Sequence, residues 1–207
     1  HMKSGSTIAE ISSIKQDSFE ALTKVPGSIN PLCIHPMFGP GTTKKTNTKI
    51  LMVPVRNRQA EASAVRWLFK DAKISVFSDA KEHDRTMGIV LGLGYFTNIV
   101  FADIISRHEI SVLKEVAGTT FRMQSLLSES VMTAEPELIM ALIMENPYAQ
   151  QYIQDYIKES SIMASKIGSG DVKSLGTKLA SIKSRLEKQQ DIQLSYKKMY
   201  EFIEKHY

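Results

Sequence analysis

The chain has 207 residues, 43% of them hydrophobic and 23% charged, with a formal net charge of +4. These values suit a globular protein with one large domain or two small ones. The charge is uneven: residues 1–78 carry +6 and residues 79–207 carry −2. The basic part could attract a small anionic molecule. It has no dense stripe of Lys and Arg with interleaved aromatics, so we expect no nucleic acid binding.

Cysteine content and the longest apolar run exclude two further classes. The single cysteine, Cys33, rules out an intrachain disulfide framework and a cysteine-rich zinc site, which fits a reducing cytoplasm. We therefore expect a cytoplasmic protein without a metal site. The first residues contain no apolar segment like that of a signal peptide. The most apolar run, residues 87–105, is interrupted by Asn98 and Asp103. We interpret it as a buried helix rather than a membrane span, and expect no membrane contact.

The first 78 residues alternate β-rich runs with helical patterns, as in an α/β layer protein. Strands are predicted at residues 6–12, 32–35, 49–55 and 73–78. Helices are predicted at residues 14–24 and 59–72. Pro54 places the end of the third strand near a sheet edge.

After Ser78 the sequence predicts helices only. Ser78 or Asp79 can cap a helix that runs to about Ser106, and Asp171 can cap the last helix. The remaining helices are predicted at residues 109–131, 135–145, 147–167 and 171–204. Glycines at positions 88, 92 and 94 cost roughly 1 kcal/mol each relative to Ala in a helix. We therefore expect another helix or a ligand to approach them closely, with tight helix packing the favoured alternative.

One expected motif is missing. A complete dinucleotide-binding unit begins with a strand, a Gly-x-Gly-x-x-Gly turn and a helix, and the sequence has no such turn. The predicted fold class is therefore a partial Rossmann-like α/β layer, residues 3–78, followed by an all-α helical dimerisation domain, residues 79–207. The α/β layer corresponds to the second half of a nucleotide-binding domain.

The stretch Asn30–Gly41, NPLCIHPMFGPG, places a histidine at the end of a predicted strand. Open α/β sheets bind their ligands at the carboxyl ends of strands. Imidazole titrates near neutral pH, so His35 could accept a hydroxyl proton. The alternative is a structural histidine that bonds a nearby carbonyl group.

Three motifs occur in a characteristic order: ISSIK at 11–15, IHPMFGPG at 34–41 and EHDRTMGIVLGLGYF at 82–96. Together they resemble the prephenate dehydrogenase family of tyrosine biosynthesis, and FRMQSLL at 121–127 is similar to that family's substrate-side helix. The family oxidises and decarboxylates prephenate to 4-hydroxyphenylpyruvate with NAD or NADP as hydride acceptor. Its subunits form homodimers through the helical domain.

The resemblance implies roles for individual residues. His35 would be the catalytic histidine that takes the hydrogen bond from the substrate's ring hydroxyl, and Ser13 the serine that bonds both this histidine and the substrate. Ser12 and Pro36 would lie on the cofactor side. His83 would either order the junction between the two segments or help to bind the substrate.

Two departures from the family pattern concern the substrate side. Ser130 stands where many members have an arginine that clamps a prephenate carboxylate; Arg122 could substitute for it, or could be a structural ion-pair residue. Tyr95 stands where several members have a histidine. The resemblance thus implies an oxidoreductase acting on prephenate or arogenate, of which this chain is the catalytic and dimerisation part. The alternative is a non-catalytic dimeric binding or regulatory module on the same scaffold.

Overall fold

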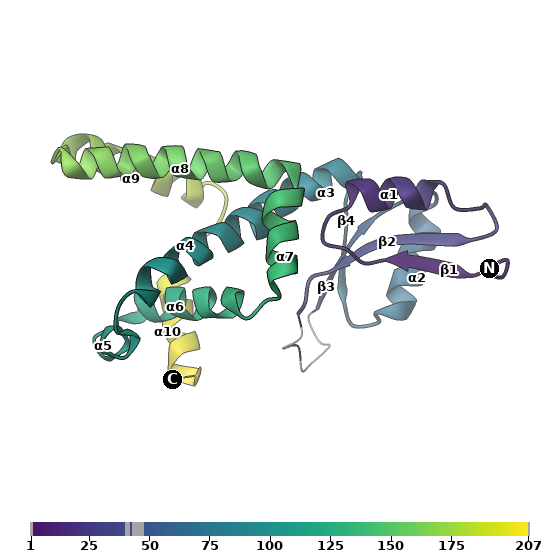
Figure 1. The fold of residues 1–207 in the computed structure, drawn as a ribbon, viewed down its shortest axis with the longest axis horizontal. Coiled ribbons are helices and arrows are strands. Elements are labelled where there is room, and N and C mark those ends of the chain that lie inside the picture. Colours follow the sequence, from purple (N-terminus) through teal and green to yellow (C-terminus); the bar gives the residue numbers. More distant parts are fainter. Residues whose placement is uncertain (1, 40–41, 43–47, 207) are drawn as a thin grey trace. The chain divides into compact units, whose positions relative to one another are not determined.

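The computed structural model describes residues 2–39, 42 and 48–206. The sheet-forming segment contains β1 (Thr7–Glu10), α1 (Gln16–Thr23), β2 (Asn30–Pro36), β3 (Lys49–Val53), α2 (Arg58–Leu68) and β4 (Lys73–Val76), as Figure 1 shows. The following segment contains α3 (Ala80–Met87), η1 (Gly88–Leu93), α4 (Gly94–Ser106), α5 (Ile110–Glu115), α6 (Thr119–Met132), α7 (Pro136–Met140), η2 (Ala141–Glu145), α8 (Pro147–Gly168), α9 (Val172–Glu187) and α10 (Ser195–His206). A mixed sheet segment followed by helices is the predicted fold class.

The chain divides into two compact units. The sheet unit comprises His1–Gly92 and Met140–Gln150, and the helical unit comprises Leu93–Ile139 and Gln151–Tyr207. The sheet unit thus continues past Ser78, where the sequence predicts the change to an all-helical segment, and takes in the first helical turns as well as a returning segment.

The sheet has the strand order β1-β2-β3-β4. Strands β1 and β2 are parallel, β2 and β3 are antiparallel, and β3 and β4 are parallel. The expectation that Pro54 lies near a sheet edge is wrong, because β3 is an inner strand. The strand ends at Val53, so Pro54 follows the hydrogen-bonded ladder and removes no donor from it.

Helices cover both faces of the sheet, with α1 and α2 on opposite sides in Figure 1. Every residue of β2 from Pro31 to His35 is buried. Successive side chains of a strand point to opposite faces of the sheet, and here helices cover both faces. Leu32 and Ile34 pack with Ala62 and Val65 of α2. Cys33 packs on the other face with Leu22 of α1 and with Ala80 at the start of α3. His35 shares this second face.

The helix predicted from Asp79 to about Ser106 is present as three consecutive segments, α3, η1 and α4. Asp79 caps it, because its carboxylate accepts a hydrogen bond from the backbone N–H of Glu82 at 2.8 Å. The middle segment, η1, is a π-helix. A Cβ built on Gly92 would lie 2.5 Å from Cβ of Ala149, and one on Gly88 would lie 2.9 Å from Cβ of Tyr148. The predicted close approach by another helix is therefore confirmed for both glycines.

The expectation that residues 87–105 form a buried helix is wrong for this single chain. Val100 and Ile104 of α4 are 39% and 52% exposed. By length and composition, the helical run Ala80–Ser106 could cross a membrane, and 17% of its most apolar window is buried. This is weak support for a membrane span, since core helices of other proteins pass the same test.

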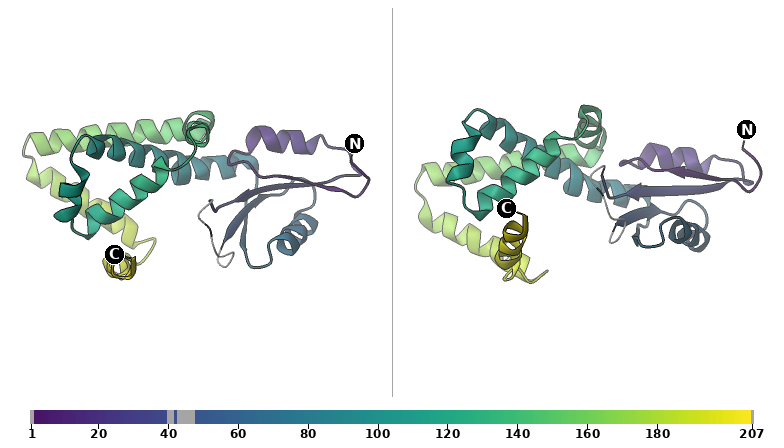
Figure 2. Two further views of the ribbon diagram at one scale, coloured as in Figure 1. Left: turned by 60° about the horizontal axis from the view of Figure 1, so that its bottom comes forward. Right: turned by 90° about the horizontal axis from the view of Figure 1, so that it is seen from below.

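Two predicted long helices are each divided in the helical unit. The segment 109–131 breaks between α5 and α6, where Gly118 has an extended backbone and precedes the first turn of α6. The segment 171–204 breaks between α9 and α10 at a polar run, residues 188–191, that lacks apolar periodicity. Figure 2 shows α9 returning from the end of α8, with α10 after it. Asp171 caps α9 as predicted, accepting from the backbone N–H of Ser174 at 3.0 Å.

Candidate active site

His35 lies near the carboxyl end of β2 and is 4% exposed. Its Nδ1 lies 3.1 Å from Nε2 of His83, and the two rings meet edge to face with centroids 5.3 Å apart. His83, on the first turn of α3, is fully buried and also packs edge to face on Phe77. The structure therefore brings two of the predicted site residues, 48 positions apart in the sequence, into one hydrogen bond.

Asp84 anchors this pair. One carboxylate oxygen, Oδ1, lies 2.8 Å from Nδ1 of His83. The same carboxylate accepts hydrogen bonds from the backbone N–H groups of Lys15, at 2.8 Å, and Gln16, at 3.0 Å. Helix α1 has no side-chain cap of its own. A carboxylate from α3 thus caps α1 from a distance in the sequence, where the positive end of the helix dipole favours it.

The backbone of Asp84 is fixed as well. Asn146, which directly precedes α8 in the returning segment of the sheet unit, is 1% exposed, and its Nδ2 donates to the carbonyl oxygen of Asp84 at 2.9 Å. Its Oδ1 accepts from the backbone N–H of Tyr148 at 2.9 Å. Buried amide groups need such partners, since an unpaired one costs roughly 1–3 kcal/mol. Asn146 therefore holds the site residues to the segment that packs on Gly88 and Gly92.

The direction of these hydrogen bonds follows from the chemistry of the groups. A carboxylate only accepts, so Nδ1 of His83 donates to Asp84. In neutral His83, Nε2 then carries the lone pair and accepts from Nδ1–H of His35. This arrangement leaves the lone pair of His35 on Nε2, which makes no hydrogen bond among the described residues. We infer that Nε2 of His35 is the atom able to accept a proton.

His35 is also held neutral. Burial is the main cause that lowers the pKa of His35 to about 4, and the neighbouring His83 and Lys15 lower it further. An uncharged imidazole can accept a proton at neutral pH, and the low pKa favours passing that proton on.

The structure places Ser13, Ser12 and Pro36 around the carboxyl ends of β1 and β2. Ser13 is half-buried in the connection from β1 to α1. The hydrogen bond from Ser13 to His35 that the resemblance implies is not among the contacts of the described residues. Ser12 is exposed, and its Oγ donates to the carbonyl oxygen of Ile14 at 2.5 Å. Pro36 closes β2 opposite Ile50. Pro40 and Gly41, the end of the proline-glycine motif, lie outside the described residues.

The two predicted substrate-side residues, Arg122 and Tyr95, belong to the helical unit. Tyr95 is half-buried on α4. Arg122 on α6 lines a cavity of about 270 Å³ whose other lining residues are Lys114, Ser125, Leu126 and Glu129. Lys114 pairs with Glu129 at 2.8 Å, whereas Arg122 makes no ion pair within the described part of the chain. Residues 2–39, 42 and 48–206 thus contain no partner for the alternative of a structural ion pair at Arg122.

Ser130 lies on α6 and Asn98 on α4 of the helical unit. Ser130 is exposed, and its hydroxyl donates to the carbonyl oxygen of Leu127 at 2.7 Å. Asn98, which interrupts the apolar run 87–105, joins α4 to α6. Its Oδ1 accepts from Nε2 of Gln124 at 2.9 Å and from Oγ of Ser128 at 3.0 Å. A polar contact of this kind fixes the relative register of two helices.

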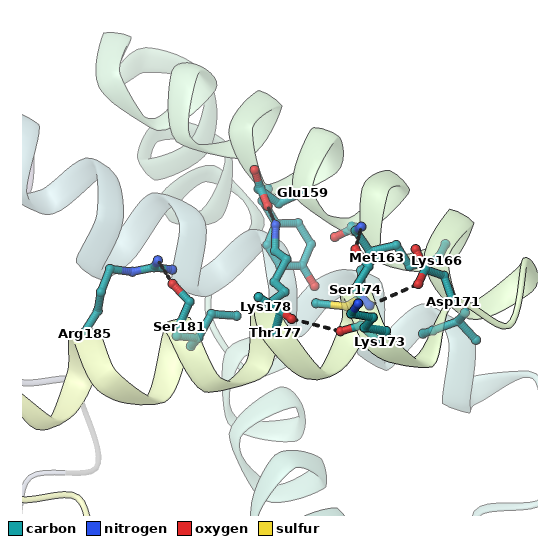
Figure 3. Close-up of a pocket in the computed structure, with 15 residues that line it drawn as sticks. Glu159, Met163, Lys166, Asp171, Lys173, Ser174, Thr177, Lys178, Ser181 and Arg185 are labelled. Carbon is teal, nitrogen blue, oxygen red and sulfur yellow. Dashed lines mark hydrogen bonds and ion pairs between the residues drawn. The ribbon is translucent and has the colours of Figure 1, made fainter.

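The helical unit has a second, larger cavity of about 1250 Å³ between α8 and α9 (Figure 3). Charged side chains from both helices line it, and Lys178 pairs with Glu159 across it. None of the predicted site residues lines this cavity. Its size therefore does not make it the candidate active site.

The residues present do not fit a complete dinucleotide. The connection between β1 and α1, residues 11–15, contains no glycine, and the sequence has no Gly-x-Gly-x-x-Gly turn that could cradle a pyrophosphate. Among the described residues, no group of three or more His, Cys, Asp or Glu side chains could hold a metal ion. The chain alone thus offers a proton acceptor without a phosphate-binding turn.

The chain thus combines an α/β sheet, a buried histidine pair at the end of a strand and a helical region that follows the sheet. This is the class of Rossmann-like proteins with a helical second region. Residues 79–181 match the family model described as prephenate dehydrogenase, dimerization domain. A probable arogenate/prephenate dehydrogenase of Methanocaldococcus jannaschii is 24% identical over 183 residues, which cover 84% of this chain. The chain belongs to the prephenate dehydrogenase family. It spans 41% of the length of this relative.

Solved structures show the same fold. Synechocystis arogenate dehydrogenase matches with a TM-score of 0.65 and 15% identity, over 88% of this chain and 69% of that one. Prephenate dehydrogenase from Aquifex aeolicus, in complex with hydroxyphenyl propionate and NAD+, matches with a TM-score of 0.65 and 16% identity, over 89% and 67%. The partial α/β layer and the helical region that the sequence predicts are thus those of known dehydrogenases.

Sequence reasoning missed three residues that build the site: Lys15, Glu10 and Asn146. Lys15 and Glu10 form an ion pair at 2.7 Å in which the lysine is fully buried. Charged residues are almost never fully buried unless they are paired, so composition and periodicity gave no signal for them. The pair Asn146-Pro147 predicts a helix start, and α8 does begin there. The contact of Asn146 with Asp84 could not be predicted, because the two residues lie 62 positions apart.

Proposed function

We propose that this chain is the catalytic and dimerisation part of an NAD- or NADP-dependent dehydrogenase that oxidises and decarboxylates prephenate or arogenate. The observation that carries the proposal is the hydrogen-bond chain from Asp84 through His83 to His35. It orients the ring of His35 and leaves Nε2 as a proton acceptor. A binding module would have no need for a proton acceptor fixed in this way.

The proposed chemistry assigns one step to this chain. The ring hydroxyl of the substrate donates its hydrogen bond to Nε2 of His35. The imidazole takes this proton while the hydride leaves the same carbon, and a carbon–oxygen double bond forms. The bond to the carboxylate then breaks and carbon dioxide leaves; its electron pair makes the ring aromatic, and the ring oxygen takes the proton back from His35. A nicotinamide cofactor bound in the intact subunit would accept the hydride, and the glycine turn that would hold its phosphates is absent from this sequence.

Two further groups have proposed places in substrate binding. Arg122 presents a guanidinium with no ion pair among the described residues at a cavity of the helical unit, and could hold a substrate carboxylate by a bidentate contact. Ser13, next to the start of α1, could donate a hydrogen bond to the substrate hydroxyl, and Tyr95 could donate another. Ser12 and Pro36 remain proposed contacts of the cofactor.

The protein is proposed to act as a homodimer in the cytoplasm. The match to a dimerization domain and the exposed apolar side chains of α4 support the dimer. A single cysteine that is fully buried, with its pKa raised by burial to about 12, is compatible with a reducing compartment.

The test is a turnover assay on the chain extended at its N-terminus by the nucleotide-binding half, with prephenate or arogenate and each cofactor. We expect turnover by the extended chain and none by the present one. His35→Asn in the extended chain should lower turnover by roughly 10²–10⁴-fold, the usual contribution of an acid–base group. Unchanged turnover would remove His35 from the mechanism.

The second candidate function is a dimeric binding or regulatory module. The missing phosphate-binding turn and the serine at position 130 favour it. The two candidates differ in what precedes the chain in its gene: an in-frame strand, glycine turn and helix would support the enzyme, and a stop codon would support the module.

A further inference from the structure

Lys15 is fully buried, and it has no role in the proton transfer proposed above. Its ammonium group donates to Oε2 of Glu10 at 2.7 Å and to the carbonyl oxygen of Ile34 at 2.6 Å. Its side chain is 0% exposed, whereas that of Glu10 is 18% exposed. Moving an ammonium group out of water costs several kcal/mol and needs compensating contacts. A buried lysine beside a candidate active site is therefore expected to have a specific role.

The contacts of Lys15 reach both ends of the hydrogen-bond chain. Its ammonium binds the carbonyl oxygen of Ile34, the residue immediately before His35. Its backbone N–H donates to Oδ1 of Asp84, the same oxygen that accepts from His83. One residue thus holds the strand that carries the proton acceptor and also the carboxylate that orients the second imidazole.

Several charged or titratable groups face His35. They are His83 and Asp84 from α3, Lys15 from the start of α1, and Glu10 from β1. Besides burial, the neighbouring His83 and Lys15 lower the pKa of His35, and Glu10 and Asp84 raise it. Burial works to raise the pKa of Glu10, but its hydrogen bonds and the charge of Lys15 prevail and lower it. Glu10 therefore stays ionised and balances the buried ammonium.

We propose that Lys15 is a positioning residue, which fixes the ring of His35 through Ile34 and Asp84. The proposal rests on the proposed function only in taking His35 as the proton acceptor. Glu10 acts through Lys15, because it compensates the charge and orients the ammonium group toward the carbonyl oxygen of Ile34.

The test is histidine-ring NMR on the full chain labelled with ¹⁵N-histidine, with His35→Gln and His83→Gln to assign the signals. Lys15→Met removes the ammonium group and keeps a long side chain. The ring N–H of His35 should then exchange with water about tenfold faster, and its protonated fraction near pH 5 should increase about twofold, because burial remains the larger cause of the lowered pKa. Backbone amide exchange in β2 is the internal reference. If the substitution only loosened the fold, the backbone amides of β2 would exchange faster together with the ring N–H.

The matched control is Lys24→Met, which removes an exposed lysine just after the same helix together with its ion pair to Glu20. It should change neither signal. Lys15→Met leaves Glu10 partly buried without its partner, so the double variant Glu10→Gln/Lys15→Met, which removes both charges, covers the case of a single variant that does not fold. In the double variant the faster ring exchange is still expected, because the carbonyl oxygen of Ile34 loses its donor.

A folded variant whose His35 ring proton exchanges at the parental rate would overturn the proposal. Unfolding of both variants would also overturn it, because Lys15 would then be required for the fold as a whole. The outcome is independent of turnover: an extended chain that is inactive on prephenate and arogenate refutes the proposed function but leaves the NMR result in place.

Discussion

Three aspartate side chains cap helices in this chain, but not all of their hydrogen-bond partners could be predicted from the sequence. Asp79 and Asp171 accept from backbone N–H groups three residues ahead, so both caps could be predicted from local spacing. Asp84 instead caps a helix that lies 69 positions earlier. The sequence places Asp84 near a helix start, as the structure does, but the same rule assigns it to its own helix. Long-range partners of this kind leave no periodic trace.

The lowered pKa of His35 predicts a dependence of stability on pH. The ordinary histidine value of 6.5 falls to about 4 in the native chain. Between these values the unfolded chain binds a proton that the native chain does not, so the free energy of unfolding decreases as pH falls from about 6.5 to about 4. Urea unfolding at pH 7, 6 and 5 should show this decrease. His35→Gln should reduce the loss in that range, and an equal loss in both proteins would contradict the assignment.

Elements were predicted best where one local signal was sufficient. The four strands lie where β-rich runs place them, because burial on both faces of the sheet favours apolar and β-branched residues. The helices at 109–131 and 171–204 were predicted too long. Gly118 and the polar run 188–191 interrupt them, and a weak break inside a helical pattern cannot be separated from a tolerated residue without knowing what packs there.

The π-helical segment η1 illustrates how packing can outweigh helix propensity. A Cβ at position 92 would lie 2.5 Å from Cβ of Ala149 and 3.2 Å from the carbonyl oxygen of Leu142. Gly92→Ala should therefore lower the free energy of unfolding by about 1–3 kcal/mol, the usual cost of overpacking, despite the better helix propensity of alanine. The matched control is Gly176→Ala in α9, where a Cβ meets nothing within 4 Å.

The control should raise stability by about 0.5–1 kcal/mol through propensity alone. Chemical denaturation of both variants measures the difference. Equal effects would mean that the contact with the returning segment is loose, and that glycine at position 92 has another cause.

At the scale of the whole molecule, the sequence predicts the order of the two architectures but not the boundary of the compact units. The family match begins at residue 79, at the cap of α3. The sheet unit nevertheless includes residues up to Gly92 and the segment Met140–Gln150. The reason lies in Asn146 and the glycines of η1, which tie a late segment of the chain to an early one. Such a return is set by contacts between distant residues.

The exposed apolar face of α4 is the predicted contact between the two subunits of a homodimer. Val100 and Ile104, one helical turn apart, are 39% and 52% exposed, and α4 lies within the matched dimerization domain. If this face is the dimer contact, a charge at its centre is desolvated without a partner on association, and this disfavours the dimer. Ile104→Glu should shift the protein from dimer to monomer in sedimentation velocity at micromolar concentration. Gln59→Glu adds the same charge to an exposed position of α2 and should leave the dimer intact. A dimer of Ile104→Glu as tight as the parent would place the contact on another face.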